Sequence, residues 1–232
     1  PICVFTMAEI HTLELGTMHN YVHLIIDRSS LSVAVVDPAW EVDKISTFCT
    51  AEGLKISAIL LTHGHHDHIN GVERLQQESG ATVYLSRLEA DHFGLNDKGW
   101  NSFEAPFQLQ LGESEIVGVA TPGHTPGGSC YHVDGNLITG DTLFVFGCGR
   151  CDLEGGDPRA MYHSLHRLLG EFAPETRVFP GHSYSTQATS TLAEERAGNP
   201  FLHCKSEAEF VEYRMLRHDQ ERSAPYGPVP RS

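Results

Sequence analysis

Short apolar runs separated by polar turns recur along most of this chain and predict a structure rich in β-strands. Residues 21–26 and 32–36 form two such runs, and the turn residues between them predict a hairpin. The pair Asp37-Pro38 ends the second run, after which residues 42–52 show the pattern of a helix closed by Gly53. Residues 56–61 then predict a short buried strand, and residues 69–77 predict the start of another helix.

The middle of the chain continues this alternation of strands and turns. Further short strands are expected at residues 81–85, 107–111, 116–120, 129–133 and 137–139. Residues 89–103 are polar and irregular, and we interpret them as a surface crossing that could form part of a lid. Residues 157–169 predict an amphipathic helix that is capped by Asp157 and has Pro158 in its first turn.

The pattern becomes helical after residue 182. Residues 189–197 and 206–218 predict two helices, with a break at Asn199-Pro200. We therefore expect a main α/β domain over residues 1–187, with two sheets and helices outside them, and a helical tail over residues 188–222 packed on it. Residues 223–232 are rich in proline, and we expect them to be disordered.

One segment carries most of the chemistry. Residues 62–68 have the sequence Thr-His-Gly-His-His-Asp-His, on a tight loop that follows the predicted strand 56–61. The carboxyl end of a strand is a common place for sites in α/β proteins. So many imidazoles close together would repel one another when protonated, whereas a divalent cation would accept their lone pairs. Such nitrogen and oxygen ligands suit zinc, iron or manganese.

Three more candidate ligands follow other apolar runs, each at a turn that contains glycine or proline. His124 lies in Thr-Pro-Gly-His-Thr-Pro-Gly, Asp141 lies in Gly-Asp-Thr, and His182 lies in Phe-Pro-Gly-His. Together with the first segment they predict a metal site. His163 and His166 are three residues apart in a predicted helix, but no carboxylate or glycine turn accompanies them, so we interpret them as ordinary helix residues.

The composition limits the possible partners. A formal charge of −14 argues against nucleic acid, whose phosphates would be repelled. The sequence shows no apolar run of 18 residues and no signal peptide at its start, so we expect a cytoplasmic protein with no membrane partner. Without a secretion signal, the six cysteines are expected to be free thiols. Cys148 and Cys151 form an isolated CxxC motif, and whether it has a role is left open.

The order HxHxDH, GHTPG, GD, GH resembles the metallo-β-lactamase superfamily, in particular its glyoxalase II-like branch, which includes hydroxyacylglutathione hydrolases and hydrolases of polyketide pathways. The resemblance covers roughly residues 15–200 and implies an αββα sandwich with two metal ions between the sheet edges. It implies two sets of ligands joined by one bridging residue, with His66 as a wall residue. The first set is His63, His65 and His124, the second is Asp67, His68 and His182, and the bridge is Asp141.

The chemistry that these ligands permit is hydrolysis. Two divalent ions, most simply Zn²⁺ but also Fe or Mn, can hold a bridging hydroxide that attacks a carbonyl carbon. Asp67 is the candidate to orient the water and accept its proton. A thiolate leaving group needs little protonation, because a thiol has a pKa near 8.5. Small-molecule or carrier-bound thioesters, such as acyl-glutathione, acyl-coenzyme A or acyl-carrier protein, are therefore the expected substrates.

Two segments distinguish among relatives. Residues 20–24, with Tyr21, resemble a strand of glyoxalase II enzymes, and Tyr21 is a candidate substrate contact or part of the sheet core. Residues 147–152, with Arg150, resemble a segment of persulfide dioxygenases, which use one non-haem iron. Arg150 is a candidate substrate residue, or one half of a buried salt bridge with Asp152 or Asp157. A persulfide dioxygenase is thus the alternative to a thioester hydrolase. The acyl group, thiol carrier, metal and oligomeric state are left open.

Overall fold

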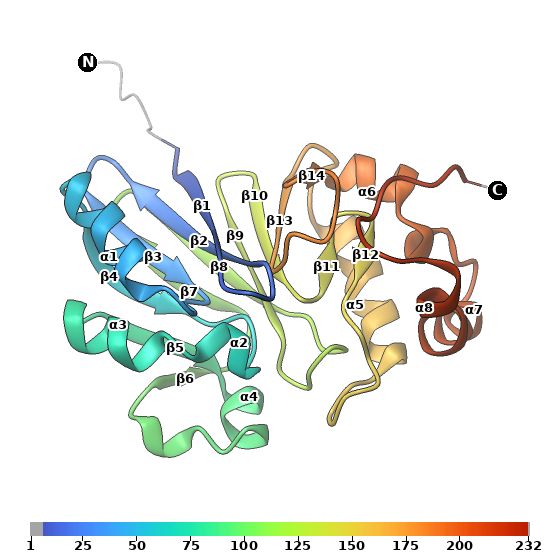
Figure 1. Ribbon diagram of the computed structural model, residues 1–232, viewed down its shortest axis with the longest axis horizontal. Helices are drawn as coiled ribbons and strands as arrows, with labels where there is room; N and C mark the ends of the chain where they lie inside the picture. The colour runs from blue at the N-terminus through green and yellow to red at the C-terminus, as the bar shows by residue number, and fades with distance from the viewer. Residues whose placement is uncertain (1–6, 232) are drawn as a thin grey trace.

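The computed structural model describes residues 7–231, so the first six residues, including Cys3, and Ser232 lie outside the described part. Within residues 7–231 the chain forms two six-stranded sheets, a two-stranded ribbon and helices (Figure 1). The strands of the first sheet follow one another in space as in sequence: β1 (Glu9–Leu15), β2 (Asn20–Asp27), β3 (Ser32–Val36), β4 (Lys55–Leu60), β5 (Thr82–Ser86) and β6 (Asn101–Phe103). The predicted hairpin is confirmed as the antiparallel pair β2–β3.

The second sheet has the spatial order β14-β13-β10-β9-β8-β7. Its strands are β7 (Phe107–Leu111), β8 (Ser114–Ala120), β9 (Ser129–Val133), β10 (Asn136–Gly140), β13 (Arg177–Pro180) and β14 (Ser190–Thr191). The ribbon consists of β11 (Leu143–Phe144) and β12 (Gly147–Cys148). In the second sheet β10 and β13 are parallel, so both point their carboxyl ends toward the same edge.

Helices cover the outer faces of both sheets (Figure 1). Those after the first sheet's strands are α1 (Val42–Ala51), α2 (His66–Ile69), α3 (Val72–Ser79), α4 (Arg87–His92) and the short η1 (Asn96–Lys98). Those of the second half are α5 (Pro158–Glu171), α6 (Leu192–Gly198), η2 (Pro200–His203), α7 (Glu207–Glu212), the π-helical turn η3 (Tyr213–Arg217) and α8 (His218–Glu221). No helix among residues 7–231 has the length and hydrophobicity needed to span a bilayer.

The side chains of each strand alternate in direction, and this alternation separates the hydrophobic cores on the two faces of a sheet. In β2, Leu24 and Ile26 belong to the core shared with α1 and α3, whereas Ile25 belongs to the core between the sheets. Successive side chains of a strand point to opposite faces, so a strand buried on both faces is apolar at every position. A third core joins the second sheet to α5 and to Phe201 and Phe210 of the helical tail. The predicted αββα sandwich with a helical tail is confirmed.

Some expectations were wrong in detail. Residues 89–103 do not form an irregular lid: they include the end of α4, the turn η1 and strand β6, which pairs with β5. The predicted helix 69–77 is divided into α2 and α3 by a turn at residues 70–71. A Cβ at Gly71 would stand 2.8 Å from the Pro38 carbonyl oxygen, so glycine allows this close approach. The predicted helix at 189–197 begins only at Leu192, after Thr191, whose side chain caps it.

The proline-rich segment does not show the expected disorder. The main-chain nitrogen of Tyr226 donates to the carbonyl of Tyr184 at 2.7 Å, and Val229 donates to Gly198 at 2.8 Å. Residues 223–231 therefore lie along the second half of the molecule as an ordered strap, which is how this segment is named below. Hydrogen bonds to other segments hold it in place, and composition does not reveal such bonds. The boundaries of the predicted domains stay a prediction.

Candidate metal centre

The seven predicted ligands come from loops and turns at one edge of the two sheets. His63 and His65 follow β4, and Asp67 and His68 lie on the short helix α2. The remaining three belong to the second sheet: His124 follows β8, Asp141 comes directly after β10, and His182 follows β13. Because β10 and β13 are parallel neighbours, their ends bring the last two residues to the same place.

The ligand atoms form two groups joined by Asp141. His65 Nδ1 lies 2.9 Å from His124 Nε2, and His63 belongs to the same group. In the second group, His68 Nε2 and His182 Nε2 are 3.2 Å apart, and each lies 3.4 Å from Asp67 Oδ2. The two carboxylate oxygens of Asp141 reach both groups, at 3.4 Å from His68 and His182 and 3.5 Å from His124.

These separations fit the edges of a metal coordination shell. A tetrahedral ion with metal–nitrogen bonds of 2.0–2.1 Å has ligand atoms about 3.3 Å apart. Moreover, two buried polar atoms of the cluster, His63 Nε2 and Asp141 Oδ1, have no hydrogen-bond partner among residues 7–231. Buried polar atoms without partners are rare and call for an explanation. A cation bound in the cluster would supply one.

The tautomers of the rings lead to the same conclusion. His68 Nδ1 donates to Asp37 Oδ2 at 3.0 Å, His182 Nδ1 to the Met18 carbonyl at 2.9 Å, and His124 Nδ1 to the Arg150 carbonyl at 2.7 Å. In the neutral rings, each proton is thus on the nitrogen that faces away from the cluster. The Nε2 lone pairs therefore face one another across the site, as in histidines that bind a metal and are oriented by a hydrogen bond from the other nitrogen.

Asp37 supports the cluster from behind and was not found by sequence reasoning. Its carboxylate accepts hydrogen bonds from the main chain and the hydroxyl of Thr62, at 2.7 and 2.6 Å, and from His68. Thr62 Oγ1 in turn lies 3.0 Å from His63 Nδ1. The sequence marked Asp37-Pro38 only as the end of a strand. Its role arises because β3 and β4 are adjacent, which places Asp37 beside Thr62.

The protonation of the cluster reflects both burial and charge. Burial raises the pKa of Asp141, but His182 and His68 lower it more, so it stays well below its usual range. Burial lowers the pKa of His182, whereas Asp141 and Asp67 raise it to about 9. Burial holds the pKa of His63 well below its usual range. The ionised carboxylates thus favour positive charge, and neutral His63 offers a lone pair to it.

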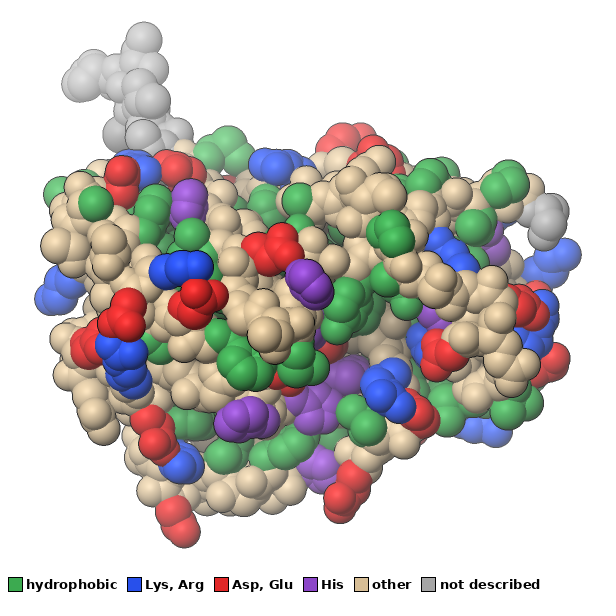
Figure 2. All heavy atoms as spheres, viewed as in Figure 1, with side chains coloured by type: hydrophobic (Ala, Val, Ile, Leu, Met, Phe, Trp, Pro, Cys, Tyr) green, Lys and Arg blue, Asp and Glu red, His purple; other side chains and the backbone are tan. Residues whose placement is uncertain are grey.

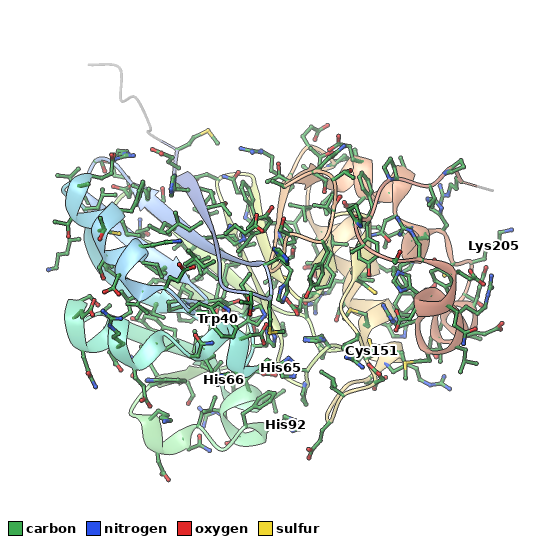
Figure 3. The ribbon with its side chains drawn as sticks, in the orientation of Figure 1. Trp40, His65, His66, His92, Cys151 and Lys205 are labelled. Atoms are coloured by element: carbon green, nitrogen blue, oxygen red, sulfur yellow. The ribbon has the colours of Figure 1, made fainter. Side chains whose placement is uncertain are left out.

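A cavity of about 490 Å³ opens over this cluster. Figure 2 shows histidine side chains gathered in a hollow near the centre of the viewed face, and in Figure 3 His65 and His66 lie across the hollow from Cys151. His66 lines the cavity but belongs to none of the ligand groups, as expected for a wall residue. The cavity wall also includes Met18, Phe144, Cys148, Arg150, Leu153, Tyr184, Arg214, Asp219 and Tyr226.

The two predicted substrate residues have different positions. Arg150 lines the cavity, and its half-exposed guanidinium makes two 2.7 Å hydrogen bonds to Asp152. The expected ion pair is thus present, although it is not buried. Tyr21 is buried in β2, its hydroxyl donates to Ser183 at 2.9 Å, and it does not line the cavity. The structure therefore favours the sheet-core interpretation of Tyr21.

Sequence reasoning did not select Arg214 as a site residue, because the tail segment 214–218 was not a clear match to a substrate-binding cluster. This arginine is 6% exposed, lines the cavity, and donates to Asp219 at 2.6 Å. It lies on η3, whose π-helical geometry departs from the 3.6-residue period that sequence patterns detect, so no periodic signal marks it. The aromatic wall residues Tyr184 and Tyr226 carried no motif of their own and were also missed.

The remaining candidate residues, a helix histidine and the cysteines, lie outside the ligand groups. His163 forms a 2.8 Å ion pair with Glu207 on the exposed side of α5, away from the ligand groups.

The five cysteines of the described part are free and buried, as predicted. Burial raises the pKa of Cys148 well above its usual range and that of Cys151 to about 12. A raised pKa disfavours the thiolate, which is the reactive form of a cysteine, at neutral pH.

Comparison with known proteins identifies the family. A family model described as the metallo-beta-lactamase superfamily matches residues 19–182, and the chain belongs to this superfamily, as predicted. The probable polyketide biosynthesis zinc-dependent hydrolase BaeB of Bacillus velezensis is 36% identical over 216 residues, which cover 91% of this chain and 95% of the relative. The chain is thus an enzyme of a metallohydrolase superfamily with a His/Asp metal-binding cluster.

Two further matches have other names. The hydroxyacylglutathione hydrolase of Alkalilimnicola ehrlichii is 36% identical over 190 residues, covering 79% of this chain and 69% of the relative. A crystal structure of ETHE1 from Myxococcus xanthus has a TM-score of 0.82 at 30% identity, with 90% of each chain covered. The shared fold therefore includes proteins with different names, and specificity must be argued from the cavity.

Proposed function

We propose that this chain is a binuclear metal-dependent hydrolase that cleaves thioesters. The observation that carries the proposal is the pair of ligand groups, each with lone pairs directed inward, with Asp141 between them. His63, His65 and His124 would hold one ion, and Asp67, His68 and His182 the other. Divalent ions bound there, most simply Zn²⁺, would polarise a carbonyl group and make water a strong nucleophile at neutral pH.

Asp67 is positioned to handle the water. Asn20 Nδ2 donates to Asp67 Oδ2 at 3.0 Å and to its main-chain carbonyl at 3.1 Å, so the carboxylate has a fixed orientation. Although burial acts in the opposite direction, His182 and His68 lower the pKa of Asp67 far below its usual range. An ionised carboxylate at the cavity wall accepts a hydrogen bond from water and thereby orients the water for attack on the carbonyl carbon. Asp67 would also be the proton acceptor, because bound divalent ions would lower the pKa of the attacking water as well.

The chemistry of the leaving group favours thioesters as substrates. In hydrolysis the oxygen of water bonds to the carbonyl carbon, the carbon–sulfur bond breaks, and a carboxylate and a thiol result without any oxidation. A thiolate leaves without strong protonation, because the pKa of a thiol is about 8.5. The ionisable groups nearest the reacting position are themselves candidate metal ligands, and this favours a substrate that needs no separate general acid.

The carrier of the acyl group would interact with the arginines of the cavity. Arg150 and Arg214 both line it, paired with Asp152 and Asp219, and an anionic carrier would compete with these carboxylates for the guanidinium groups. Guanidinium groups bind carboxylates and phosphates through paired hydrogen bonds. This supports an anionic carrier such as glutathione, coenzyme A or a carrier protein. BaeB is named for polyketide biosynthesis, which favours a carrier-bound acyl group for this chain too.

The second candidate is a persulfide dioxygenase with one iron. Residues 147–152, Gly-Cys-Gly-Arg-Cys-Asp, favour it through their resemblance to that group. It would use two histidines and Asp141 and would leave His68 and His182 without a metal. The 3.2 Å approach of those two rings, with Asp67 beside both, supports the two-metal proposal instead.

The two candidates differ in the reactions that they catalyse. We expect the purified protein to release thiol from acyl-coenzyme A or acyl-pantetheine without consuming oxygen. Lactoylglutathione should be a modest substrate at best, because residues 214–218 of the tail are not a clear match to the cluster with which glyoxalase II enzymes bind glutathione. Arg150→Ala should raise KM more than it lowers kcat for anionic carriers, whereas Arg159→Ala, an exposed arginine paired with Glu207, should change neither. A thiol-release assay and an oxygen electrode, used on one preparation, measure both reactions. Oxygen uptake with glutathione persulfide and no thiol release from any thioester would refute the hydrolase.

A further inference from the structure

Tyr226 of the strap, residues 223–231, lines one side of the cavity. The strap is held to the loop after His182 by the Ser185–Tyr226 bridge: Tyr226 N donates to the Tyr184 carbonyl at 2.7 Å, and Thr186 N donates to the Tyr226 carbonyl at 3.1 Å. Ser185 Oγ adds a hydrogen bond to the same carbonyl at 2.8 Å. The strap is therefore attached to the same loop that carries a candidate metal ligand.

The ring of Tyr226 is fixed from several sides. His218 packs edge-on against it with centroids 5.5 Å apart, and the Arg222 guanidinium lies 5.0 Å from its centroid. A Cβ on Gly147 would stand 3.1 Å from two ring carbons, so the ring lies directly on the β11–β12 ribbon. Arg222 also donates to the Phe146 carbonyl at 2.7 Å, which joins the ribbon to the start of the strap. A ring held in this way forms a rigid wall.

This wall continues an aromatic surface that begins at the metal ligands. Tyr184 stacks on His182 with centroids 4.6 Å apart, and Phe144 packs against Tyr184 at 5.3 Å. Tyr226 lines the same cavity, and its main-chain nitrogen is hydrogen-bonded to the Tyr184 carbonyl. An apolar group next to the reacting carbonyl would be buried against this surface, and burial of apolar area is the main source of affinity in such cavities.

We propose that Tyr226 is a specificity-determining residue, which ends the aromatic wall and limits the length of the apolar acyl chain that the cavity accepts. This inference rests on the proposed function, because it assumes that an acyl group lies beside His182. Short acyl chains then fit between the metal ligands and the ring, whereas longer chains meet the strap. The side of the cavity that carries Arg150 is left for the carrier.

Acyl-pantetheines from acetyl to octanoyl, which share one carrier, test the proposal. We expect kcat/KM of the wild type to fall for the longer chains. Tyr226→Ala should raise kcat/KM for octanoyl relative to acetyl by about tenfold or more, since one or two methylene groups in an apolar pocket change discrimination by 10–200-fold. Tyr226→Phe keeps the ring and should keep the chain-length profile. Pro228→Ala is the matched strap control, because Pro228 packs on Gly198 and does not line the cavity.

A binding series separates this proposal from the proposed function. S-alkyl-pantetheine thioethers of the same lengths cannot be hydrolysed, and calorimetry gives their Kd for each variant. If the wild type releases no thiol from any thioester, the proposed function fails, and the thioether series still tests the wall. If Tyr226→Ala retains its metal and its melting temperature but shows the wild-type length dependence in both series, the strap proposal is overturned. If that variant loses metal or does not fold, Tyr226→Leu, with a smaller apolar side chain, replaces it under the same criteria.

Discussion

Single residues outside the ligand set determine how the ligands are presented. His23 of β2 is an example, since it is 2% exposed and its Nε2 donates to the Pro180 carbonyl at 2.8 Å, two residues before His182. Its Nδ1 accepts from Thr12 Oγ1 at 2.9 Å. The bond that Nδ1 accepts requires the neutral ring, and burial lowers the pKa of His23 to about 4.

This lowered pKa predicts a pH dependence of stability. In the unfolded chain a histidine has a pKa of about 6.5, so between pH 6.5 and 4 the unfolded state binds the additional proton. The stability from neutral His23 is thus present above pH 6.5 and is lost as the pH falls toward 4. From pH 7 to pH 5 this loss is about 2 kcal/mol. Denaturant unfolding at both pH values should show a smaller difference for His23→Phe than for the wild type.

The control for this experiment is His166→Gln, an exposed position on α5, which should lose as much stability between the two pH values as the wild type does. Protonation of the ligand histidines contributes equally in all three proteins and cancels in the comparison. An unchanged pH difference in His23→Phe would contradict the assignment of a buried neutral ring.

At the scale of elements, helix α4 connects two ligand loops. Its Glu89 is fully buried and accepts from the main-chain nitrogen of Gly64 at 2.8 Å and of Gly127 at 2.6 Å. These nitrogens belong to the loops that carry His63, His65 and His124. The sequence suggested a surface crossing here, because the residues are polar. Only the contact with two distant loops gives this glutamate a role.

We expect Glu89→Gln to loosen both loops together. The amide can accept only one of the two hydrogen bonds, and a buried donor left without an acceptor costs about 1–3 kcal/mol. Loss of such support for metal ligands lowers metal affinity by about 10–100-fold. Competition with a chromogenic chelator measures this affinity, and Glu104→Gln, an exposed glutamate near Arg87, is the matched control. Equal metal affinity in both variants would show that Glu89 does not position the site.

At the scale of the whole molecule, the cluster joins the two halves of the sandwich. His63, His65, Asp67 and His68 follow the first sheet, and the other three ligands follow strands of the second. A cation held by both sets therefore cross-links the sheets. Ligands that bind only the folded state stabilise it, by about 4 kcal/mol when their concentration is a thousand times Kd.

Metal removal should accordingly lower the melting temperature, and Zn²⁺ should restore it.

We expect elemental analysis of protein purified without added metal to give two ions per chain. Asp141→Ala should lose at least one ion and the activity while the fold persists, because the three cores of the sandwich do not include Asp141. One iron per chain and no second metal would contradict the two-metal proposal, as would full retention of both ions by Asp141→Ala.

The sequence by itself determined the layered fold and the candidate ligands. Alternating apolar runs encode strands locally, and the ligand motifs are short and lie directly after such runs, so no long-range information was needed to find them. Asp37, Glu89, Arg214 and Tyr226 could not be found in this way, because each acts through segments distant in the sequence. The folded chain brings Asp37 beside Thr62, joins Glu89 to two loops and places Tyr226 of the strap at the cavity. The physical reason is that hydrogen bonds between residues far apart in the chain, made by side chains or by the main chain, leave no periodic trace in the sequence.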